Sequence, residues 1–439
     1  MVLKDRIFSY LSDSEKSLNG ENPSYMSMLQ RESIDLFRKK GFPLYTDEEW
    51  RNTNIHSILN QEDNFLRSKK NLESLNINIK NIKESLFLSQ KDSFLIIFVN
   101  GKYNSFLSTS NFSSKTTDNN NIILSNIASQ KEEKIRNFYG KLSYKYDSFN
   151  ALNTIFSKDG VYIYIPDNVF LKKPIEILHI STESKVLFHP RNLIIVGKSS
   201  FVRIVEHHKC LKKHLGLINS VSEIYAFYNS KIEYYKIQDD LEESSMIDNT
   251  FFKQSLYSKC SVHTFSFQGK WIRNNLNIYS HGKSASSYLY GISLLSGKQL
   301  VDHHTLVDHL YSDSISFQLY KNILWEKSKG IFNGKIIVNK WIKGINAFQK
   351  NNNILLSDEA CIYTNPQLEI FSDDVKCSHG CTVGNIHESD LFYFQSRGIP
   401  ETESKILLLL SFLEEVLKPI NIFKLKNLLL KKMKKKLDI

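Results

Sequence analysis

Two thiols and one imidazole stand at alternate positions in the segment DDVKCSHGCTVG, residues 373–384. They are Cys377, His379 and Cys381. On an extended backbone, side chains at i, i+2 and i+4 point to the same side of the strand. Thiolate and imidazole together form a ligand set that suits iron-sulfur chemistry. The segment therefore predicts either half of a metal site that another subunit completes, or an ordinary strand with buried Cys and His side chains.

A second group of possible ligands lies in the motif VDHHTLVDH. On a strand, Asp302, His304 and Asp308 share one side, while His303 and His309 share the other. A zinc or manganese site built from His304 and the two carboxylates is stereochemically possible. The competing function is therefore a metal-dependent hydrolase, or a polysaccharide lyase if the chain forms a β-helix. We favour the alternative that these are polar residues on the outer face of a coil or at a subunit contact.

Two GKS tripeptides, at 197–199 and 282–284, raise the question of nucleotide binding. A phosphate-binding P-loop has a glycine five positions before its second glycine, and Asn192 and Asn277 stand at those positions. We therefore predict a tight turn at each tripeptide and no nucleotide-binding site. This chain alone is not expected to hydrolyse ATP.

The composition indicates a cytoplasmic protein. The chain has 439 residues, of which 41% are hydrophobic and 23% charged, and this is enough apolar material for a sizeable core. Five cysteines, an odd number scattered along the chain, do not resemble a secreted disulfide framework. The opening sequence MVLKDRIFSYLSDSEK lacks the continuous apolar stretch of a secretory signal. The longest apolar run, at 406–413, is far shorter than the roughly 20 residues of a membrane-spanning helix.

The net charge of +11 does not by itself indicate nucleic-acid binding, because the lysines are spread along the chain. The one basic cluster is the terminal sequence KLKNLLLKKMKKKLDI. There Leu425, Leu428 and Leu429 recur at helical spacing with lysines between them. We predict a packed helix with a solvated basic face, rather than a helix that binds a membrane or an acidic partner.

Residues 1–92 have the pattern of an N-terminal helical domain. A helix is expected at 29–40, and Gly41 followed by Phe and Pro is a strong stop signal. Directly after it, Thr46 and Glu49 have the spacing of a capping box, which predicts the start of a second short helix.

The rest of the chain divides into a linker, a long β region and a helical end. Residues 93–159 are predicted to contain a β-hairpin with Asn100-Gly101 in a type I′ turn. Residues 160–384 form a series of short strand-like runs separated by polar turns. This pattern predicts a β-helix rather than a single sandwich, which would be too small for so many strands. Residues 385–439 return to helical periodicity and form the C-terminal helical domain.

The stretch NPQLEIFSDDVKCSHGCTVGNIHESDLFYFQSRGIP, residues 365–400, closely resembles the C-terminal hallmark of SufD-type chains in the SufB/SufD family. These are scaffold proteins of the SUF system of iron-sulfur cluster assembly. The sequences GFPLYTDEEWRNTNI, GKQLVDHHTLVDH and KGIFNGKIIVNKWIKGINAFQKNNNILLSDEA follow the same family, so the resemblance covers nearly the whole chain. The SufD type is favoured because KCSHG is present and the N-terminal cysteine motif of SufB-type chains is absent.

The resemblance implies a right-handed parallel β-helix flanked by N- and C-terminal α-helical domains, in a scaffold subunit that is not an enzyme. It further implies pairing with SufB through the two β-helices. The SufC ATPase is expected to bind the C-terminal helical domain, and a cysteine desulfurase system to deliver sulfur. A transient iron-sulfur cluster would be shared with SufB, and no tightly bound cofactor is expected in the isolated chain.

The resemblance also carries over individual site residues. The family's interface histidine matches His379 and its neighbouring cysteine matches Cys377, so both are expected at the contact with SufB. Cys381 departs from the family pattern, in which a small apolar residue is usual, and no ligand role is assigned to it. The residues expected to contact the ATPase are apolar positions of the C-terminal domain: Ile406, Leu407, Leu409, Leu410, Phe412 and Leu413.

Overall fold

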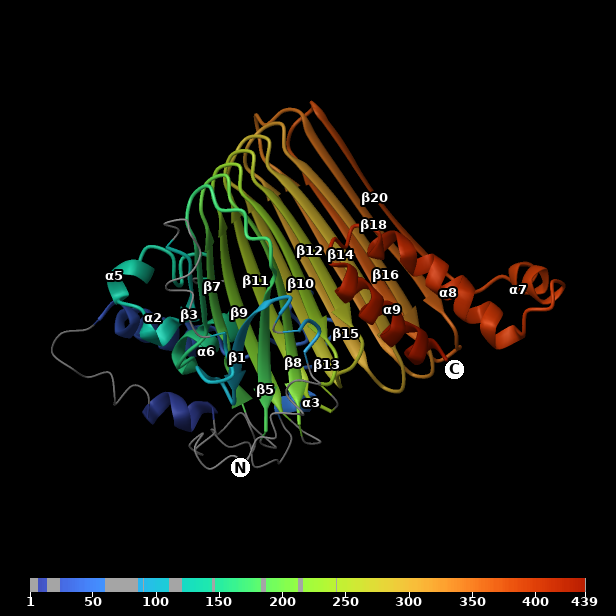
Figure 1. Ribbon diagram of the computed structural model, residues 1–439, viewed down its shortest axis with the longest axis horizontal. Helices are drawn as coiled ribbons and strands as arrows, with labels where there is room; N and C mark the ends of the chain where they lie inside the picture. Colours follow the sequence, from blue (N-terminus) through green and yellow to red (C-terminus); the bar gives the residue numbers. More distant parts are fainter. Residues whose placement is uncertain are drawn as a thin grey trace.

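The chain forms a long parallel β-solenoid, with helices at its N-terminal end and further helices along one side near its C-terminus (Figure 1). This computed structural model describes residues 7–13, 24–59, 86–89, 91–109, 121–143, 147–182, 187–211, 216–241 and 243–438. The expected N-terminal domain and linker therefore lie partly outside the described residues. The predicted parallel β-helix between helical ends is confirmed.

Two ten-stranded sheets form the walls of the solenoid, and the chain alternates between them so that each coil adds one strand to either wall. The first sheet holds, in spatial order, β2 (Lys102–Tyr103), β1 (Phe94–Val99), β5 (Ile175–Ser181), β8 (Phe201–Cys210), β10 (Lys231–Gln238), β12 (Lys259–Ser266), β14 (Ser286–Leu295), β16 (Ile315–Leu324), β18 (Ile345–Leu355) and β20 (Val375–Gly384). The second holds β19 (Cys361–Ile370), β17 (Lys329–Val338), β15 (Leu300–His309), β13 (Trp271–Ser280), β11 (Ser245–Gln254), β9 (Leu217–Ala226), β7 (Arg191–Val196), β4 (Val161–Ile165) and β3 (Ile123–Asn126), with β6 (Leu187–Phe188) paired to β9.

One corner of the solenoid is built from residues in the left-handed backbone region. The corner positions of successive coils, with φ between 50° and 61°, include Asn168, Ser199, Asn229, Tyr257 and Ser284. Each corner bonds to the next coil, as where the N–H of Ser199 donates to the carbonyl of Tyr228 at 2.8 Å. Both GKS tripeptides lie here, so the predicted tight turns are confirmed. A Cβ at Gly282 would lie 2.0 Å from the backbone nitrogen of Leu256, which leaves room for glycine only.

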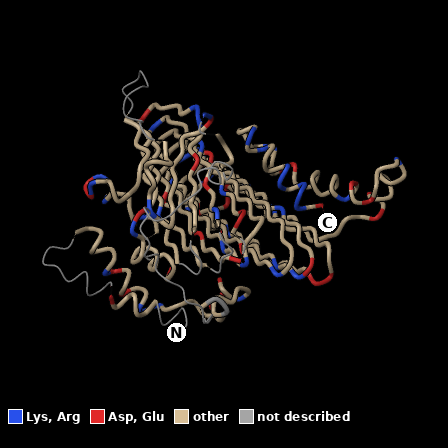
Figure 2. Tube along the Cα trace, turned by 60° about the horizontal axis from the view of Figure 1, so that its bottom comes forward, with Lys and Arg blue, Asp and Glu red and all other residues tan. Residues whose placement is uncertain are grey.

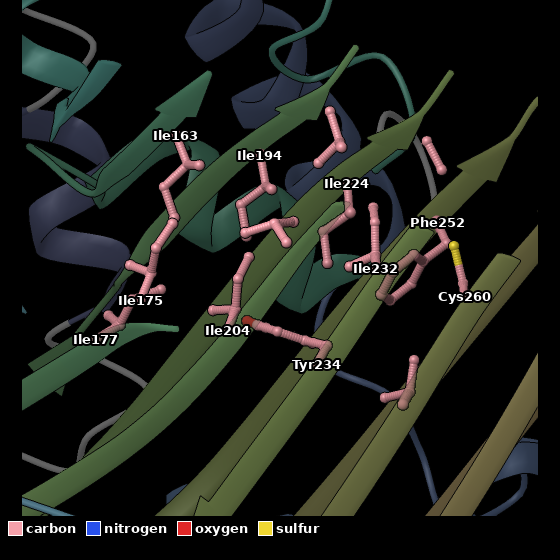
Figure 3. Packing of buried hydrophobic residues seen from close by; sticks show 14 of the residues in the cluster. Ile163, Ile175, Ile177, Ile194, Ile204, Ile224, Ile232, Tyr234, Phe252 and Cys260 are labelled. Carbon is pink, nitrogen blue, oxygen red and sulfur yellow. The ribbon is translucent and has the colours of Figure 1, made fainter. Parts of the chain in front are cut away.

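Inward-facing side chains fill the space between the two sheets. In the N-terminal half a large apolar cluster joins the walls, with Ile163 and Ile194 from the second sheet and Ile204 and Tyr234 from the first (Figure 3). Farther along the same strands the inward positions become polar, as at Glu206, two residues beyond Ile204. The solenoid core is therefore apolar near the left-handed corner and polar in its middle, and a second apolar cluster with Leu241, Met246 and Ile272 lies toward the opposite corner.

Strands β1 and β2 form the predicted hairpin. They are antiparallel, and the turn residues Asn100 and Gly101 have φ of 50° and 77°, as a type I′ turn requires. Strand β1 also pairs in parallel with β5. The hairpin therefore extends the first sheet beyond the first coil.

Helices gather at the N-terminal end of the solenoid. They are a segment at 7–13, α2 (Tyr25–Lys40), α3 (His56–Leu59), η3 (Ile127–Ser129), α5 (Glu132–Ile135) and α6 (Ser148–Phe156). Helix α2 ends as predicted, because Gly41 takes a φ of 65° and its N–H donates to the carbonyl of Phe37. Apolar residues of these helices pack on the outer face of the second sheet, as at Trp271.

The predicted capping box at Thr46 is wrong. Only a single 3-10 turn, η1 (Glu48–Trp50), forms there, and no side chain caps it. The reason is that the carboxylate of Asp47 accepts a hydrogen bond from the N–H of Leu44 at 2.9 Å, which makes a turn before the helix can start. Trp50 is then buried under the guanidinium of Arg273, 4.0 Å from the centre of its ring.

Helices α7 (Glu388–Gln395), α8 (Glu401–Leu417) and α9 (Phe423–Leu437) follow the last strand. Helices α8 and α9 lie along the outer face of the first sheet, and α7 projects away from it (Figure 1). Leu425, Leu429, Met433 and Leu437 of α9 are buried, while lysines such as Lys424, Lys431 and Lys434 are exposed. Lysines recur along the whole helix (blue in Figure 2). The predicted packed helix with a basic face is confirmed. In the described part of the chain, no helix has the length and apolar character needed to cross a membrane.

One lysine of α9 lies in an apolar setting, and its titration predicts how stability changes with pH. The ammonium of Lys436 donates to the carbonyl of Phe267, and burial lowers its pKa to about 8. Between pH 8 and about 10.5 the unfolded chain therefore binds more protons than the folded chain, so stability rises with pH over this range. Below pH 8 the full cost of burying the charge is present.

We expect Lys436→Met to remove this cost and to raise the thermal midpoint at pH 7 by about 1–2 °C. The advantage over the wild type should shrink as the pH rises from 8 to 10, because the wild-type lysine becomes neutral there. Thermal unfolding of both chains across this range measures the difference. A constant difference between pH 7 and pH 10 would show that Lys436 is not desolvated.

Candidate functional site

Cys377, His379 and Cys381 lie on β20, the last strand of the first sheet. This strand pairs with β18 on one side only, with Cys377 opposite Ala347 and His379 opposite Gln349. Because Ala347 and Gln349 are buried, the three side chains continue the inward-facing row of the solenoid. The alternation expected from the sequence is therefore present, and the three ligands share one face.

Within the described residues, no further coil covers this row. Cys377 is half-buried against the apolar end of the solenoid core, which includes Ile345 and Ala347, whereas His379 and Cys381 are exposed. Strands β19 and β20 end the two sheets side by side. The solenoid thus has an open end with unpaired strand edges, and edges of this kind pair readily with another chain.

The pKa of the Cys377 thiol determines whether it is charged at neutral pH. Partial burial raises the pKa of its thiol above the usual range, against a smaller opposing effect of the Ala347 N–H. The thiol is therefore protonated at neutral pH in the isolated chain. Since a thiolate binds metal better than a thiol, a metal bound by Cys377 would displace this proton.

The sequence analysis missed the side chains that stack behind His379 in the core. Gln349 pairs in register with His379, and Gln318 with Gln349. Both amides are buried, and Gln349 Nε2 donates to Gln318 Oε1 at 3.2 Å. No signal in the sequence identifies this row, because it depends on the register between coils that are far apart in the chain.

The VDHHTLVDH motif does not form the metal site that its spacing permits. Asp302 is buried, and its Oδ2 accepts hydrogen bonds from Arg273 at 2.9 Å and from Thr53 at 2.6 Å. His304 lies 2.9 Å from the other oxygen of Asp302, but Asp308 accepts from an asparagine on a later loop. Asp302 thus binds the N-terminal segment, through Thr53, to the outer face of the solenoid. It does not support a hydrolase or lyase site.

The apolar residues expected to contact the ATPase are divided between two faces of α8. Ile406, Leu409 and Leu413 are buried in a cluster with the first sheet and α9. Lys321 of β16 holds this face, because its ammonium donates to the carbonyl of Phe412 at 2.8 Å. Half of the six apolar residues expected at the ATPase contact are therefore buried inside the chain itself.

The opposite face of α8 and the projecting helix α7 remain available. Leu407 is 46% exposed, and Phe392 and Tyr393 of α7 are 71% and 54% exposed. Leu410 and Phe412 are half-buried. Both α7 and the outer side of α8 therefore carry exposed apolar side chains.

Comparison with known families agrees with this architecture. A family model described as the SUF system FeS cluster assembly SufBD core domain matches residues 179–412, and a model of the SufBD protein N-terminal region matches residues 1–177. The chain belongs to the SufBD family. Members of the SufBD family are components of iron-sulfur cluster assembly and are not catalytic enzymes.

Curated relatives carry names from the same system. A Synechocystis protein named as an iron-sulfur cluster assembly SufBD family protein is 28% identical over 92% of this chain and 89% of its own length. The iron-sulfur cluster assembly protein SufD of Escherichia coli is 26% identical over 56% of this chain and 59% of its own length. The chloroplastic protein ABCI7 of Arabidopsis thaliana is 30% identical over 62% and 59%. The chain spans most of the cyanobacterial relative and about three fifths of the other two.

Proposed function

We propose that this SufBD protein is the SufD-type scaffold subunit of a cytoplasmic SUF complex, in which it pairs with a SufB-type chain and a SufC-type ATPase to build iron-sulfur clusters. The observation that carries the proposal is the row of thiol and imidazole ligands on an open terminal strand. A ligand row that ends at an unpaired edge suits a site whose second half comes from another chain. The name of the Escherichia coli relative supports the same assignment.

In this proposal the four parts of the chain have separate tasks. The solenoid, at 160–384, presents its open end to the SufB-type chain. The C-terminal helical domain, at 385–439, binds the ATPase. The helices of the N-terminal domain, at 1–92, pack on the outer face of the second sheet, and the hairpin of the linker, at 93–159, extends the first sheet. The cluster is cargo: it forms transiently between the two scaffold chains near His379 and Cys377 and then leaves for an apoprotein.

Anaerobic co-expression with SufB, SufC and a cysteine desulfurase system tests the proposal. We expect three chains to co-elute in size-exclusion chromatography, and iron and sulfide to be found on the complex but not on this chain alone. Failure to co-elute at micromolar concentration would refute the assignment to a SUF complex. A full cluster load on the isolated chain would refute the shared site.

The ATPase contact is tested at the exposed surface of α7 and α8. Deleting everything after Gly384 would uncover the buried face of the first sheet, so surface substitutions give a cleaner result. We expect Leu407→Glu together with Phe392→Glu to weaken capture of the ATPase by about tenfold or more, because both place a charge in an apolar contact. Pull-down of SufC over a concentration series measures the loss, and pairing with SufB should be unchanged.

Phe106→Glu is the matched control, because Phe106 is 97% exposed and lies in the N-terminal hairpin region. This variant should bind SufC like the wild type. Undiminished capture by the Leu407 and Phe392 variant would exclude the α7–α8 surface as the ATPase contact.

A further inference from the structure

A buried cluster of two histidines and a glutamate lies inside the N-terminal half of the solenoid, far from β20 in the order of the strands. His179 is on β5, and Glu206 and His208 are on the neighbouring strand β8. One possible ligand atom from each of the three lies within 4.8 Å of the others. No other group of three His, Cys, Asp or Glu residues in the described part of the chain meets this condition.

The three side chains lie close together, but the two imidazole rings lie face to face, so one ring must rotate before both can bind the same ion. The rings of His179 and His208 stack with their centres 4.6 Å apart and their planes at 14°. His179 Nε2 lies 3.2 Å from Glu206 Oε1. The glutamate is held in place by outer partners, since Asn192 donates to Oε1 at 2.8 Å and the hydroxyl of Tyr234 donates to Oε2. Oriented carboxylates with such outer partners are typical of metal sites.

The charged group nearest the cluster already has a partner. Lys236 lies 4.0 Å from Glu206 and forms an ion pair with Asp248.

A small pocket adjoins the two imidazoles. Its volume is about 20 Å³, which is near the minimum for one water molecule or ion. His179, His208, Phe188 and Ile218 are among the residues that line it. Both histidines thus border the pocket and the cluster at the same time.

We propose that His179, Glu206 and His208 bind one divalent transition-metal ion inside the solenoid. Two imidazoles with one carboxylate are a ligand set for Fe²⁺, Co²⁺ or Zn²⁺. The ion takes the place of the proton between His179 and Glu206, and its charge compensates the buried carboxylate. This site is separate from the strand that carries Cys377, and it does not rest on the function proposed above.

Titration of the purified full-length chain with Co²⁺, after treatment with a chelator, tests the proposal. We expect one ion per chain, seen by visible absorption and by metal analysis, in a background variant with Cys377→Ser and His379→Ala that removes the ligands of β20. In the same background, His208→Gln and Glu206→Gln should each lose about tenfold or more in affinity. Both are close in size to the native residues, and circular dichroism without metal checks that they fold.

His303→Gln is the matched control. His303 is another buried imidazole of the solenoid core, bonded to Ser293 at 3.0 Å and not part of the cluster. This variant should bind Co²⁺ like the background chain, and Zn²⁺ should raise the thermal midpoint of both but not that of His208→Gln. If the background chain binds no Co²⁺ at micromolar concentration, or if His208→Gln and Glu206→Gln both bind it normally, the metal site is refuted.

Discussion

Glu223→Ala is expected to destabilise the chain by about 3–5 kcal/mol, the usual cost of leaving one partner of a buried ion pair alone. Glu223 is fully buried on β9, and its Oε2 accepts from Arg191 at 2.7 Å. Its two oxygens also accept from the backbone N–H groups of Gly140, Leu142 and Ser143 at 2.7 to 3.0 Å. The substitution would therefore leave the buried charge of Arg191 without its counter-ion, and three backbone N–H groups without an acceptor.

Urea unfolding followed by circular dichroism measures the loss, and proteolysis near residue 140 shows whether the N-terminal segment has detached. The double variant Arg191→Met with Glu223→Leu should lose less than the sum of the two single variants, because no unpaired charge remains. Glu369→Ala is the control, since its ion pair with Lys335 is partly exposed and should contribute little. Equal losses for Glu223→Ala and Glu369→Ala would contradict a structural role for the buried pair.

His379→Ala is expected to reduce the iron and sulfide bound per SUF complex by about tenfold or more, if the proposed shared site is right. Removing even an outer partner of a metal ligand commonly costs 10- to 100-fold, and a direct ligand should cost at least as much. His379 is exposed in the isolated chain, so the substitution leaves no cavity. The thermal midpoint of the chain and the ATPase activity of the complex should therefore be unchanged.

Ser378→Ala is the matched control, because Ser378 is the exposed neighbour of His379 on the other face of β20. It should leave the cluster load unchanged, and Cys381→Ala should do the same. Size-exclusion chromatography run beside the metal analysis separates two explanations. If His379→Ala loses cluster only in proportion to lost complex, the histidine is a contact residue, and if the cluster load stays normal, it has no part in assembly.

Local signals predicted those parts of the fold that local chemistry determines. The glycine after α2 and the Asn100-Gly101 turn both require left-handed backbone, and this requirement can be seen in the sequence. The alternation of Cys377 and His379 on one face follows from strand geometry alone. These predictions needed no knowledge of distant residues.

Contacts between distant residues could not be predicted in the same way. Asp302 has the neighbours of a metal ligand in the sequence, but it pairs with Arg273 on the adjacent coil and with Thr53, which is far away in the chain. His179 and Glu206 meet because β5 and β8 are adjacent in the sheet, and their register depends on the length of the coil between them, which includes β6 and β7. The apolar positions of α8 likewise indicate a buried face without indicating what covers it.

The stacked left-handed corners give the solenoid a regular repeat, so its length depends on the number of coils. Each coil repeats the same corner and adds one strand to each sheet, so insertion or loss of one whole coil would change the length by about 4.8 Å and leave both ends intact. The number of coils therefore sets the distance between the first coil, where the hairpin extends the first sheet, and the ligands on β20. Evolution can adjust this distance in fixed steps without redesigning the chemistry at either end.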